Sequence, residues 1–241
     1  RLNIAERKKV ERANEALIED LNAFAHTVAH DLKNPLARVI GFVDLLSDDR
    51  VELSEEDVET GFQAIIRGAY KMNDIIDELL LFAKIRSVDI EVNSLNMDSI
   101  VGEAIERLND SIQSQQAEVI LPTSWPAVFG YASWVEEIWV NYLSNGLKYG
   151  GQPPRLELGA DIQEDNMVRF WINDNGPGLS PKDLDRLFTK FSRLEQHSDI
   201  EGSGLGLSIV QRIVTKLGGE VGIESKLGQG STFSFTLPQA R

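Results

Sequence analysis

The sequence contains no cysteine among its 241 residues. This absence excludes disulfide bonds, thiolate metal ligands and a cysteine nucleophile. No signal peptide is expected, and no apolar run reaches the roughly 18 residues that a membrane-spanning helix requires. Basic residues are scarce, since 24 Lys and Arg stand against 38 Asp and Glu and leave a net charge of −14. This balance argues against a protein that wraps nucleic acid or lies on an anionic membrane, but it does not exclude a bound nucleotide.

The overall composition is that of an ordinary globular protein. Hydrophobic residues make up 42% of the chain and charged residues 26%, and 241 residues suffice for one large or two modest domains. Arg1 opens a stretch that already has helical character. We therefore expect the chain to be the C-terminal part of a longer protein.

The first 22 residues are charged and favour a helix. Apolar side chains recur along this stretch and beyond it at the spacing of a coiled-coil seam, namely at Val10, Leu17, Leu21, Phe24 and Val28. Asn14 falls on the same seam, where coiled coils use a polar residue to fix the register. The pattern predicts dimerisation, and the alternative is a solvated helix without a partner.

His30 lies off this seam, so its imidazole is expected to face water rather than the core. It stands directly before Asp31 and one turn before Pro35. An exposed histidine in this setting has no evident structural use, which marks it as a candidate functional residue. His26 lies one turn earlier, but no third ligand accompanies the pair, so a metal site is not expected there.

A helical hairpin is predicted for the first part of the chain. The helix with His30 continues through Leu46, and a turn over residues 47–53 follows. Ser54 and Asp57 form a capping box that begins a second helix, which ends near Arg86. Its apolar residues have helical spacing, namely Val58, Phe62, Ile65, Ile66, Ala69, Met72, Ile75, Ile76, Leu79 and Leu80. Because a lone hairpin cannot cover both apolar faces, we expect two hairpins to pair as a four-helix bundle.

Beyond about residue 92, short apolar runs alternate with helical stretches. The pattern predicts a mostly antiparallel α+β layer fold. Strands are expected at residues 119–121, 127–129, 156–158, 168–172, 220–224 and 232–237, and helices near 98–114, 131–149 and 204–217.

The helix expected at 131–149 has two distinct faces. Its buried stripe consists of Val135, Ile138, Trp139, Tyr142, Leu143 and Leu147. Another face carries Glu137, Asn141, Asn145 and Lys148. Carboxylate and amide oxygens stacked over successive turns suit a hard divalent cation such as Mg²⁺, and the lysine adds a positive charge for phosphate. If this pattern is considered alone, the alternative is an ordinary solvent-exposed helix face.

Two glycine-rich segments follow. Asp174 ends a predicted strand before Gly176 and Gly178, so its carboxylate is placed to accept a hydrogen bond from an exocyclic amine such as that of adenine. A plain Asn-Gly turn is the alternative. The glycines within residues 202–206 precede an apolar helix whose first N–H groups suit an anion, although their spacing is not the Rossmann fingerprint.

The charged stretch between residues 178 and 202 has the character of a mobile lid. Phe188 and Phe191 are its apolar anchors, and Lys190 and Arg193 are candidates for contacts with phosphate.

Taken in order, these motifs resemble those of the sensor histidine kinases of two-component signalling. The likeness rests on His-Asp-x-x-Asn-Pro, Asn-x-x-x-Asn with Lys, Asp-x-Gly-x-Gly, Phe-x-x-Phe and Gly-x-Gly-x-Gly, over roughly residues 20–238. It implies an α + α/β protein: an antiparallel helical hairpin that dimerises into a four-helix bundle, followed by an α/β sandwich ATPase domain of the Hsp90/gyrase/histidine kinase type. The implied domains are an N-terminal coiled-coil signalling helix at 1–22, a dimerisation and histidine phosphotransfer domain at 23–90, and a catalytic ATP-binding domain at 91–241.

For the first domain, the resemblance implies that His30 is the phosphoacceptor and that Asp31 accepts its proton. Asn34 matches the residue that orients water for dephosphorylation of the partner. Pro35 is expected to kink the helix, because it leaves the Asp31 carbonyl without a helix partner. The implied function is autophosphorylation from ATP, transfer to an aspartate of a response regulator, and phosphatase activity toward that regulator.

For the second domain, the resemblance implies ATP and Mg²⁺ as cofactors. Asn145 matches the metal ligand, Tyr149 the residue that stacks on adenine, and Asp174 the acceptor of its hydrogen bond. The implied nucleotide-site residues are Glu137, Asn141, Asn145, Lys148, Tyr149, Asp174, Gly176, Gly178, Leu179, Lys190, Phe191, Arg193, Gly202, Ser203, Gly204, Leu205, Gly206, Leu207 and Thr232. Ser203 stands where the family frequently has Thr, which is a mild departure.

The resemblance further implies a homodimer, a response-regulator receiver domain as partner, and a sensor domain upstream of this chain. It implies no nucleic-acid partner and a cytoplasmic location, which is compatible with a membrane anchor upstream. Two other functions fit parts of the pattern. One is a dimeric signalling scaffold with a vestigial nucleotide site, and the other is an ATP-driven clamp, which would lack the phosphoacceptor hairpin.

Overall fold

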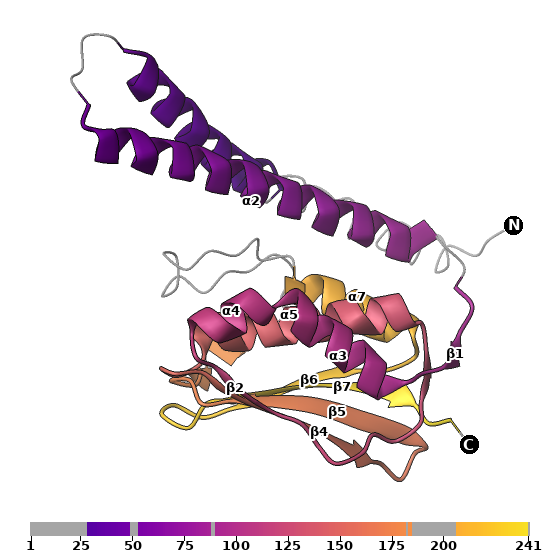
Figure 1. Cartoon of the computed structure of the whole chain (residues 1–241). Coiled ribbons are helices and arrows are strands. Elements are labelled where there is room, and N and C mark those ends of the chain that lie inside the picture. Colours follow the sequence, from indigo (N-terminus) through magenta and orange to yellow (C-terminus); the bar gives the residue numbers. More distant parts are fainter. Residues whose placement is uncertain (1–27, 49–52, 88–89, 182, 185–205, 241) are drawn as a thin grey trace, which may run out of the picture. The chain divides into compact units, whose positions relative to one another are not determined.

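The computed structural model describes residues 28–48, 53–87, 90–181, 183–184 and 206–240. The chain divides into two compact units, Arg1–Leu81 and Phe82–Arg241. The described part of the first is a helical hairpin, and the second is a mixed sheet covered by helices (Figure 1). This confirms the predicted fold class. None of the helices in the described part of the chain combines the length and apolar character needed to span a bilayer.

The two helices of the first unit are antiparallel. They span residues 28–47 and Glu55–Ser87 (α2), and the last residues of α2 belong to the second unit. A Cβ added at Gly61 would meet Leu46 at 3.1 Å, and one added at Gly68 would meet Val39 at 2.6 Å. Residue numbers therefore fall along one helix as they rise along the other, as in the predicted hairpin.

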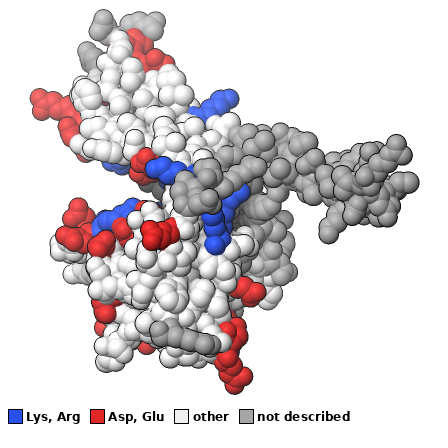
Figure 2. Space-filling model, turned by 90° about the vertical axis from the view of Figure 1, so that its right-hand side faces the viewer, with Lys and Arg blue, Asp and Glu red and all other residues white. Residues whose placement is uncertain are grey.

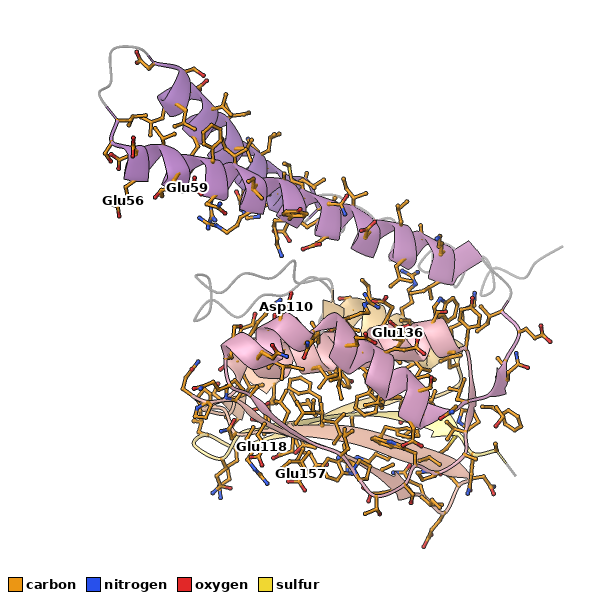
Figure 3. The ribbon with its side chains drawn as sticks, in the orientation of Figure 1. Glu56, Glu59, Asp110, Glu118, Glu136 and Glu157 are labelled. Atoms are coloured by element: carbon orange, nitrogen blue, oxygen red, sulfur yellow. The ribbon has the colours of Figure 1, made fainter. Side chains whose placement is uncertain are left out.

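The predicted capping box begins α2. The backbone N–H of Asp57 donates to Oγ of Ser54 at 3.1 Å, and the N–H of Ser54 donates to Oδ2 of Asp57 at 3.1 Å. The hydrogen bonds from the hydroxyl and N–H of Ser54 lower the pKa of Asp57. Glu56 and Glu59 project from the start of α2 (Figure 3). Glu55, Glu56 and Asp57 belong to its first turn, where acidic side chains interact favourably with the helix dipole. Local sequence thus sets this helix end.

The hairpin leaves a broad apolar surface uncovered. Ile75 of α2 is 1% exposed, whereas Phe62 and Leu80 of the same helix are 52% and 55% exposed. The other exposed large apolar residues of the hairpin are Leu36, Ile40, Val43, Leu45, Ile66, Tyr70 and Ile76. Figure 2 shows a wide area of the hairpin without charged side chains. Clustered exposed apolar residues are typical of interaction sites.

The second unit is built on a five-stranded sheet with the order β2-β4-β5-β7-β6. The strands are β2 (Glu118–Ile120), β4 (Arg155–Ile162), β5 (Met167–Asp174), β6 (Val221–Ser225) and β7 (Ser231–Pro238). A separate antiparallel pair consists of β1 (Asn93–Ser94) and β3 (Phe129–Gly130). In the large sheet β2 pairs in parallel with β4, and the other pairings are antiparallel. The predicted mostly antiparallel sheet is confirmed.

Helices cover one face of this sheet (Figure 1). They are α3 (Met97–Arg107), α4 (Asn109–Ser114), α5 (Ala132–Tyr149) and α7 (Gly206–Lys216). The helical stretch expected near 98–114 is present, but it consists of two helices, because the chain leaves helical geometry at Leu108, with φ −106° and ψ 8°. The N–H of Leu108 turns back to the carbonyl of Ile105 at 3.1 Å, so α3 ends there and α4 starts anew.

Aromatic side chains join α5 to the sheet. Trp139 meets Phe235 edge-on with 5.3 Å between ring centroids, and Phe170 stacks on Phe235 at 5.2 Å. The hydroxyl of Tyr142 donates to the Ser234 carbonyl at 3.1 Å, and burial raises its pKa. This packing fixes α5, which carries five of the predicted nucleotide-site residues, over β5 and β7.

The last turn of α2 packs within the second unit. Ile85 is 1% exposed, and its carbonyl accepts a hydrogen bond from Nζ of Lys216 at 2.6 Å. The last carbonyls of a helix have no partner inside the helix, so an ammonium group completes this helix end and complements its dipole. Lys216 closes α7, and its Nζ lies 5.6 Å from the centroid of the Trp134 ring.

Candidate functional site

His30 and Asp31 form a hydrogen-bonded pair on the helix over residues 28–47. Nδ1 of His30 lies 3.2 Å from Oδ1 of Asp31. The His30 side chain is 60% exposed, as predicted, whereas that of Asp31 is 5% exposed. Oδ2 of Asp31 is buried and has no hydrogen-bond partner among the described residues. With Nδ1 turned to the carboxylate, Nε2 is the ring nitrogen that is oriented to meet a reactant from solvent.

Asn34 lies one turn beyond this pair. Its Nδ2 is 3.5 Å from Nδ1 and 3.4 Å from Nε2 of His30, so the carboxamide lies over the ring without a short hydrogen bond. Pro35 is buried, and the helix continues to residue 47. The kink expected at Pro35 stays a prediction.

The predicted metal and phosphate residues share a face of α5. Nδ2 of Asn145 donates to Oδ1 of Asn141 at 3.1 Å, so the two carboxamides touch one turn apart. Both are partly buried, and Lys148 is exposed. A Cβ added at Gly206, the first residue of α7, would collide with the carboxamide of Asn141. The end of the glycine-rich motif therefore lies directly against this pair, and Leu207 follows it partly buried.

Glu137 is engaged by a residue that the sequence did not indicate. Nη1 of Arg107, at the end of α3, donates to Glu137 at 2.8 Å and to Glu136 at 2.7 Å. Partial burial opposes the charge of the guanidinium, but the hydrogen bonds and charges of the two carboxylates outweigh it and raise the pKa of Arg107. The Glu137 carboxylate is thus held toward α3. Its assignment as a support for the metal ligand stays a prediction.

Asp174 ends β5 in a buried position, with 7% of its surface exposed. Its Oδ1 accepts hydrogen bonds from the N–H groups of Gly176 at 2.8 Å and Ser231 at 3.2 Å. Burial raises the pKa of Asp174, and these two hydrogen bonds only partly offset the rise. Among the described residues, Oδ2 has no hydrogen-bond partner, so it is available to accept one from a ligand.

Ser231, rather than Thr232, lies beside Asp174. Ser231 is 5% exposed on the helix-covered face, together with the core residue Phe235 of the same strand. Thr232 faces the opposite side of the sheet, where its hydroxyl accepts a hydrogen bond from Nδ2 of Asn173 at 2.8 Å. Successive side chains of a strand alternate between the faces, so the parity of the aromatic core residues would have indicated Ser231. We therefore replace Thr232 by Ser231 in the candidate site.

Glycines allow the ends of α5 and β5 to touch. A Cβ added at Gly176 would lie 2.5 Å from the carbonyl oxygen of Tyr149. Gly178 has φ +68°, and a Cβ there would collide with the carbonyl of Lys226. The N–H of Leu179 donates to Oγ of Ser225 at 2.8 Å. The structure thus brings Tyr149 and Asp174, the two predicted adenine contacts, to adjoining element ends.

Several predicted residues lie outside the described residues. They are Lys190, Phe191, Arg193, Gly202, Ser203, Gly204 and Leu205 of the lid and the glycine motif. The same holds for the N-terminal coiled coil at 1–22.

The chemistry of the α5 face fits Mg²⁺. Among the described residues no group of three or more His, Cys, Asp or Glu could hold a metal. Mg²⁺ at nucleotide sites needs few protein ligands, because phosphate oxygens and water supply the others. The adjoining carboxamides of Asn141 and Asn145 supply oxygens of the required hard type beside the start of α7.

Family models match both units of the chain. Residues 20–88 match the His Kinase A (phospho-acceptor) domain. Residues 130–241 match the histidine kinase-, DNA gyrase B- and HSP90-like ATPase family. These ranges contain, respectively, the His30–Asp31 pair and the residues around Asp174.

Individual proteins show the same two-part likeness. The chain is 32% identical over 232 residues to the phytochrome-like protein Cph1 of Synechocystis sp., which covers 96% of this chain and 30% of that protein. It therefore spans less than a third of that relative's length. ShkA, solved at full length in complex with AMPPNP, matches with a TM-score of 0.63 and 26% identity over 89% of this chain and 45% of ShkA. ThkA, solved in complex with the response regulator protein TrrA, shares the fold, with a TM-score of 0.75 and 18% identity over 97% of this chain and 66% of that one.

Proposed function

Because this chain belongs to the sensor histidine kinases, we propose that it transfers the γ-phosphoryl group of ATP to His30 and then to an aspartate of a response regulator. One observation carries the proposal, namely an exposed imidazole whose Nδ1 is held by the buried Asp31 carboxylate. An exposed nucleophile with an adjacent base is what a covalent phosphoenzyme requires. The complex of ThkA with a response regulator supports the class of partner.

Autophosphorylation would replace the P–O bond to ADP by an N–P bond to His30. The lone pair of Nε2 forms the N–P bond to the γ-phosphorus, while the P–O bond to ADP breaks and ADP leaves with that electron pair. The Nδ1 proton passes to the carboxylate of Asp31, which lies 3.2 Å away. In the second step an aspartate oxygen of the regulator displaces the imidazole, and the proton returns to the ring.

The second unit would position the donor. Tyr149 would stack on the purine and Oδ2 of Asp174 would accept its exocyclic N–H, since both lie at adjoining element ends. Asn145, supported by Asn141, would hold Mg²⁺, which neutralises charge on the phosphoryl group. Lys148 is exposed one turn from Asn145 and would contact the phosphates.

The experiment that tests the proposal is incubation of the chain with γ-labelled MgATP, followed by addition of a receiver domain. Label should appear on the chain in an acid-labile, alkali-stable bond, as an N–P bond requires, and should then move to the receiver domain. Sustained ATP hydrolysis without a phosphoenzyme would contradict the proposal and indicate a clamp-type ATPase.

We further propose that the chain dimerises through the hairpin. The exposed apolar residues of α2, among them Phe62, Ile66 and Leu80, are those that a second hairpin would cover. The corresponding domains are a signalling helix at 1–22, a dimerisation and phosphotransfer domain at 23–90 and an ATP-binding domain at 91–241. Sedimentation of the chain should give twice its mass of 26.9 kDa, and a monomer at micromolar concentration would contradict this arrangement.

The position of Asn34 supports a phosphatase role toward the regulator. Its carboxamide lies 3.4 Å from Nε2 of His30, where it would orient a water molecule toward the regulator's phosphoaspartate. Asn34→Ala should lower the dephosphorylation rate about tenfold or more and leave autophosphorylation within about threefold. Asn73→Ala is the matched control, because Asn73 is an exposed asparagine of the same hairpin that bonds to Asp77. Equal phosphatase rates in the two variants would remove the role from Asn34.

A further inference from the structure

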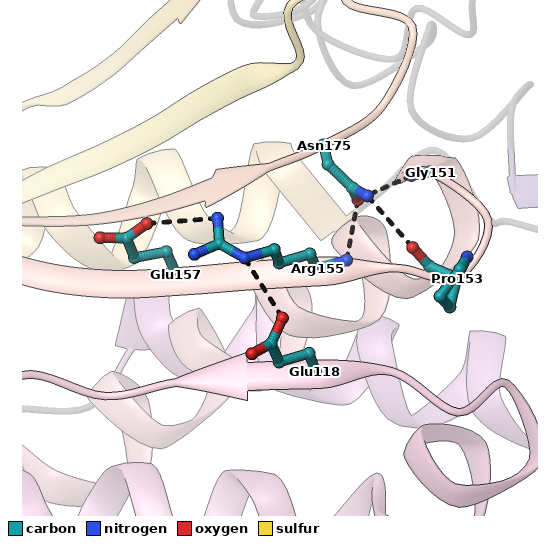
Figure 4. Close-up of polar contacts among 6 residues, drawn as sticks. All are labelled: Glu118, Gly151, Pro153, Arg155, Glu157 and Asn175. Atoms are coloured by element: carbon teal, nitrogen blue, oxygen red, sulfur yellow. Dashed lines mark hydrogen bonds and ion pairs between the residues drawn. The ribbon is translucent and has the colours of Figure 1, made fainter.

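Asn175 directly follows Asp174, one of the two residues proposed to hold the purine, and the proposed function assigns it no role. It follows Asp174 at the end of β5 and is itself exposed. Figure 4 shows its side chain directed away from the strand and into the segment that follows α5. That segment connects Tyr149, the last residue of α5, with Arg155, the first residue of β4.

The carboxamide of Asn175 bonds to backbone groups of this segment. Its Oδ1 accepts from the N–H of Gly151 at 3.0 Å and from the N–H of Arg155 at 2.8 Å. Its Nδ2 donates to the carbonyl of Pro153 at 3.1 Å. The Asn175 side chain therefore uses both acceptor sites of its oxygen and one N–H donor to bind three backbone groups of the segment between α5 and β4.

Packing shows that the segment and the strand end fit closely. A Cβ added at Gly151 would lie 2.5 Å from Nδ2 and 2.7 Å from Cγ of Asn175. The N–H of Gly150 still bonds to the Gly146 carbonyl at 2.9 Å, so the segment starts as a direct continuation of α5. A displacement of the segment would thus act on the last turn of α5, where Tyr149 lies.

The ion pairs at the same place are a weaker connection. The Arg155 guanidinium lies 3.2 Å from Glu118 and 3.6 Å from Glu157 (Figure 4). All three side chains are 43% or more exposed, and exposed ion pairs contribute little. The backbone N–H of Arg155, which Asn175 binds, is therefore the more important of its contacts.

We propose that Asn175 is a positioning residue of the purine site. It holds residues 150–155 so that Tyr149 and Asp174 keep the separation that a purine ring requires between them. This inference rests on the proposed function, because it takes ATP as the ligand of this site. Asn175 itself touches no reacting atom and is not a catalytic residue.

The test compares Asn175→Ala with Asn175→Asp in the full chain. Asn175→Ala removes all three hydrogen bonds, so KM for ATP in autophosphorylation should rise about five- to tenfold, while kcat stays within about twofold. Asn175→Asp keeps the acceptor for both N–H groups but loses the donor to the Pro153 carbonyl, so its KM should lie between those of the wild type and Asn175→Ala. A merely structural role would instead lower the active fraction, and so the apparent kcat, at unchanged KM.

Hydrogen exchange supplies a readout that is independent of activity. In the wild type and in Asn175→Asp, the amides of Gly151 and Arg155 should exchange slowly, and in Asn175→Ala both should lose protection. Arg155→Ala is the matched control, since it removes the two ion pairs and keeps the backbone N–H, and it should leave KM and both amides unchanged.

Two outcomes distinguish a failure of the positioning role from a failure of the proposed function. If the wild-type chain binds ATP and Asn175→Ala binds it equally well, the positioning role is wrong and the proposed function stands. If the wild-type chain binds no nucleotide at all, the proposed function fails, and this inference fails with it.

Discussion

Replacing His30 by glutamine should reduce transfer of label from MgATP to the chain to background. Glutamine is similar in length and polarity, but it offers no nitrogen lone pair that can attack phosphorus. The substitution lies at an exposed position, with 60% of the side chain accessible, so the fold should be retained. Binding of ATP should be unchanged, because the nucleotide residues lie in the second unit. The measurement is phosphoenzyme formation together with ATP affinity.

His26 provides the matched control for this result. It precedes His30 by four residues, but Asp-Leu-Lys-Asn-Pro follows only His30. His26→Gln should therefore label as well as the wild type. If His30→Gln retained label and His26→Gln lost it, the phosphoacceptor would be wrongly assigned. If both variants labelled normally, neither histidine would be the sole phosphoacceptor.

Replacing Asp174 by asparagine should weaken ATP binding by about a hundredfold or more. Asparagine keeps an oxygen for the N–H groups of Gly176 and Ser231, which lie 2.8 and 3.2 Å from the carboxylate. Its amide nitrogen then takes the place of Oδ2 and meets the exocyclic amine of adenine donor to donor. A buried polar group that is left without a hydrogen-bond partner reduces affinity by about this factor. Calorimetric titration with ATP measures the loss.

The same variant should not be less stable than the wild type at neutral pH. Burial raises the pKa of Asp174 above its ordinary value, so ionisation is less favourable in the folded chain than in the unfolded chain. Above the folded-state pKa the carboxylate therefore lowers the free energy of unfolding, and asparagine removes this cost. Any gain in melting temperature should shrink as the pH falls through that pKa. A large loss of stability at pH 7 would show instead that the charge supports the fold.

Thr232→Val tests which side of β7 belongs to the site. Thr232 bonds to Asn173 on the face opposite Asp174, so its loss should leave ATP affinity within about twofold. A loss comparable to that of Asp174→Asn would restore Thr232 to the site and contradict the placement of Ser231.

Features that depend on neighbouring residues could be predicted from the sequence. The Ser54–Asp57 capping box and the exposure of His30 follow from spacing alone, because each involves residues within one turn of a helix. The strands of the sheet were also predicted in place, since alternating apolar residues define them. The break at Leu108 was not predicted, because apolar residues continue at helical spacing on both sides of it.

Features that depend on distant residues could not be predicted. The carboxylate of Glu137 bonds to Arg107, which is 30 residues earlier in the chain, and only the packing of α3 beside α5 brings them together. The hydrogen bonds of Asn175 depend on the path of residues 150–155, for which no sequence pattern exists.

One helix of the second unit has a different contact at each end. α7 has 11 residues and is therefore about 16 Å long. Its first residue, Gly206, lies against Asn141, and its last, Lys216, binds the carbonyl of Ile85. A helix of three turns moves as a stiff rod, so a shift at the nucleotide end would be delivered to the last turn of α2. Binding of a nucleotide beside Gly206 would then change the hydrogen bond between Lys216 and the Ile85 carbonyl, because both contacts belong to α7.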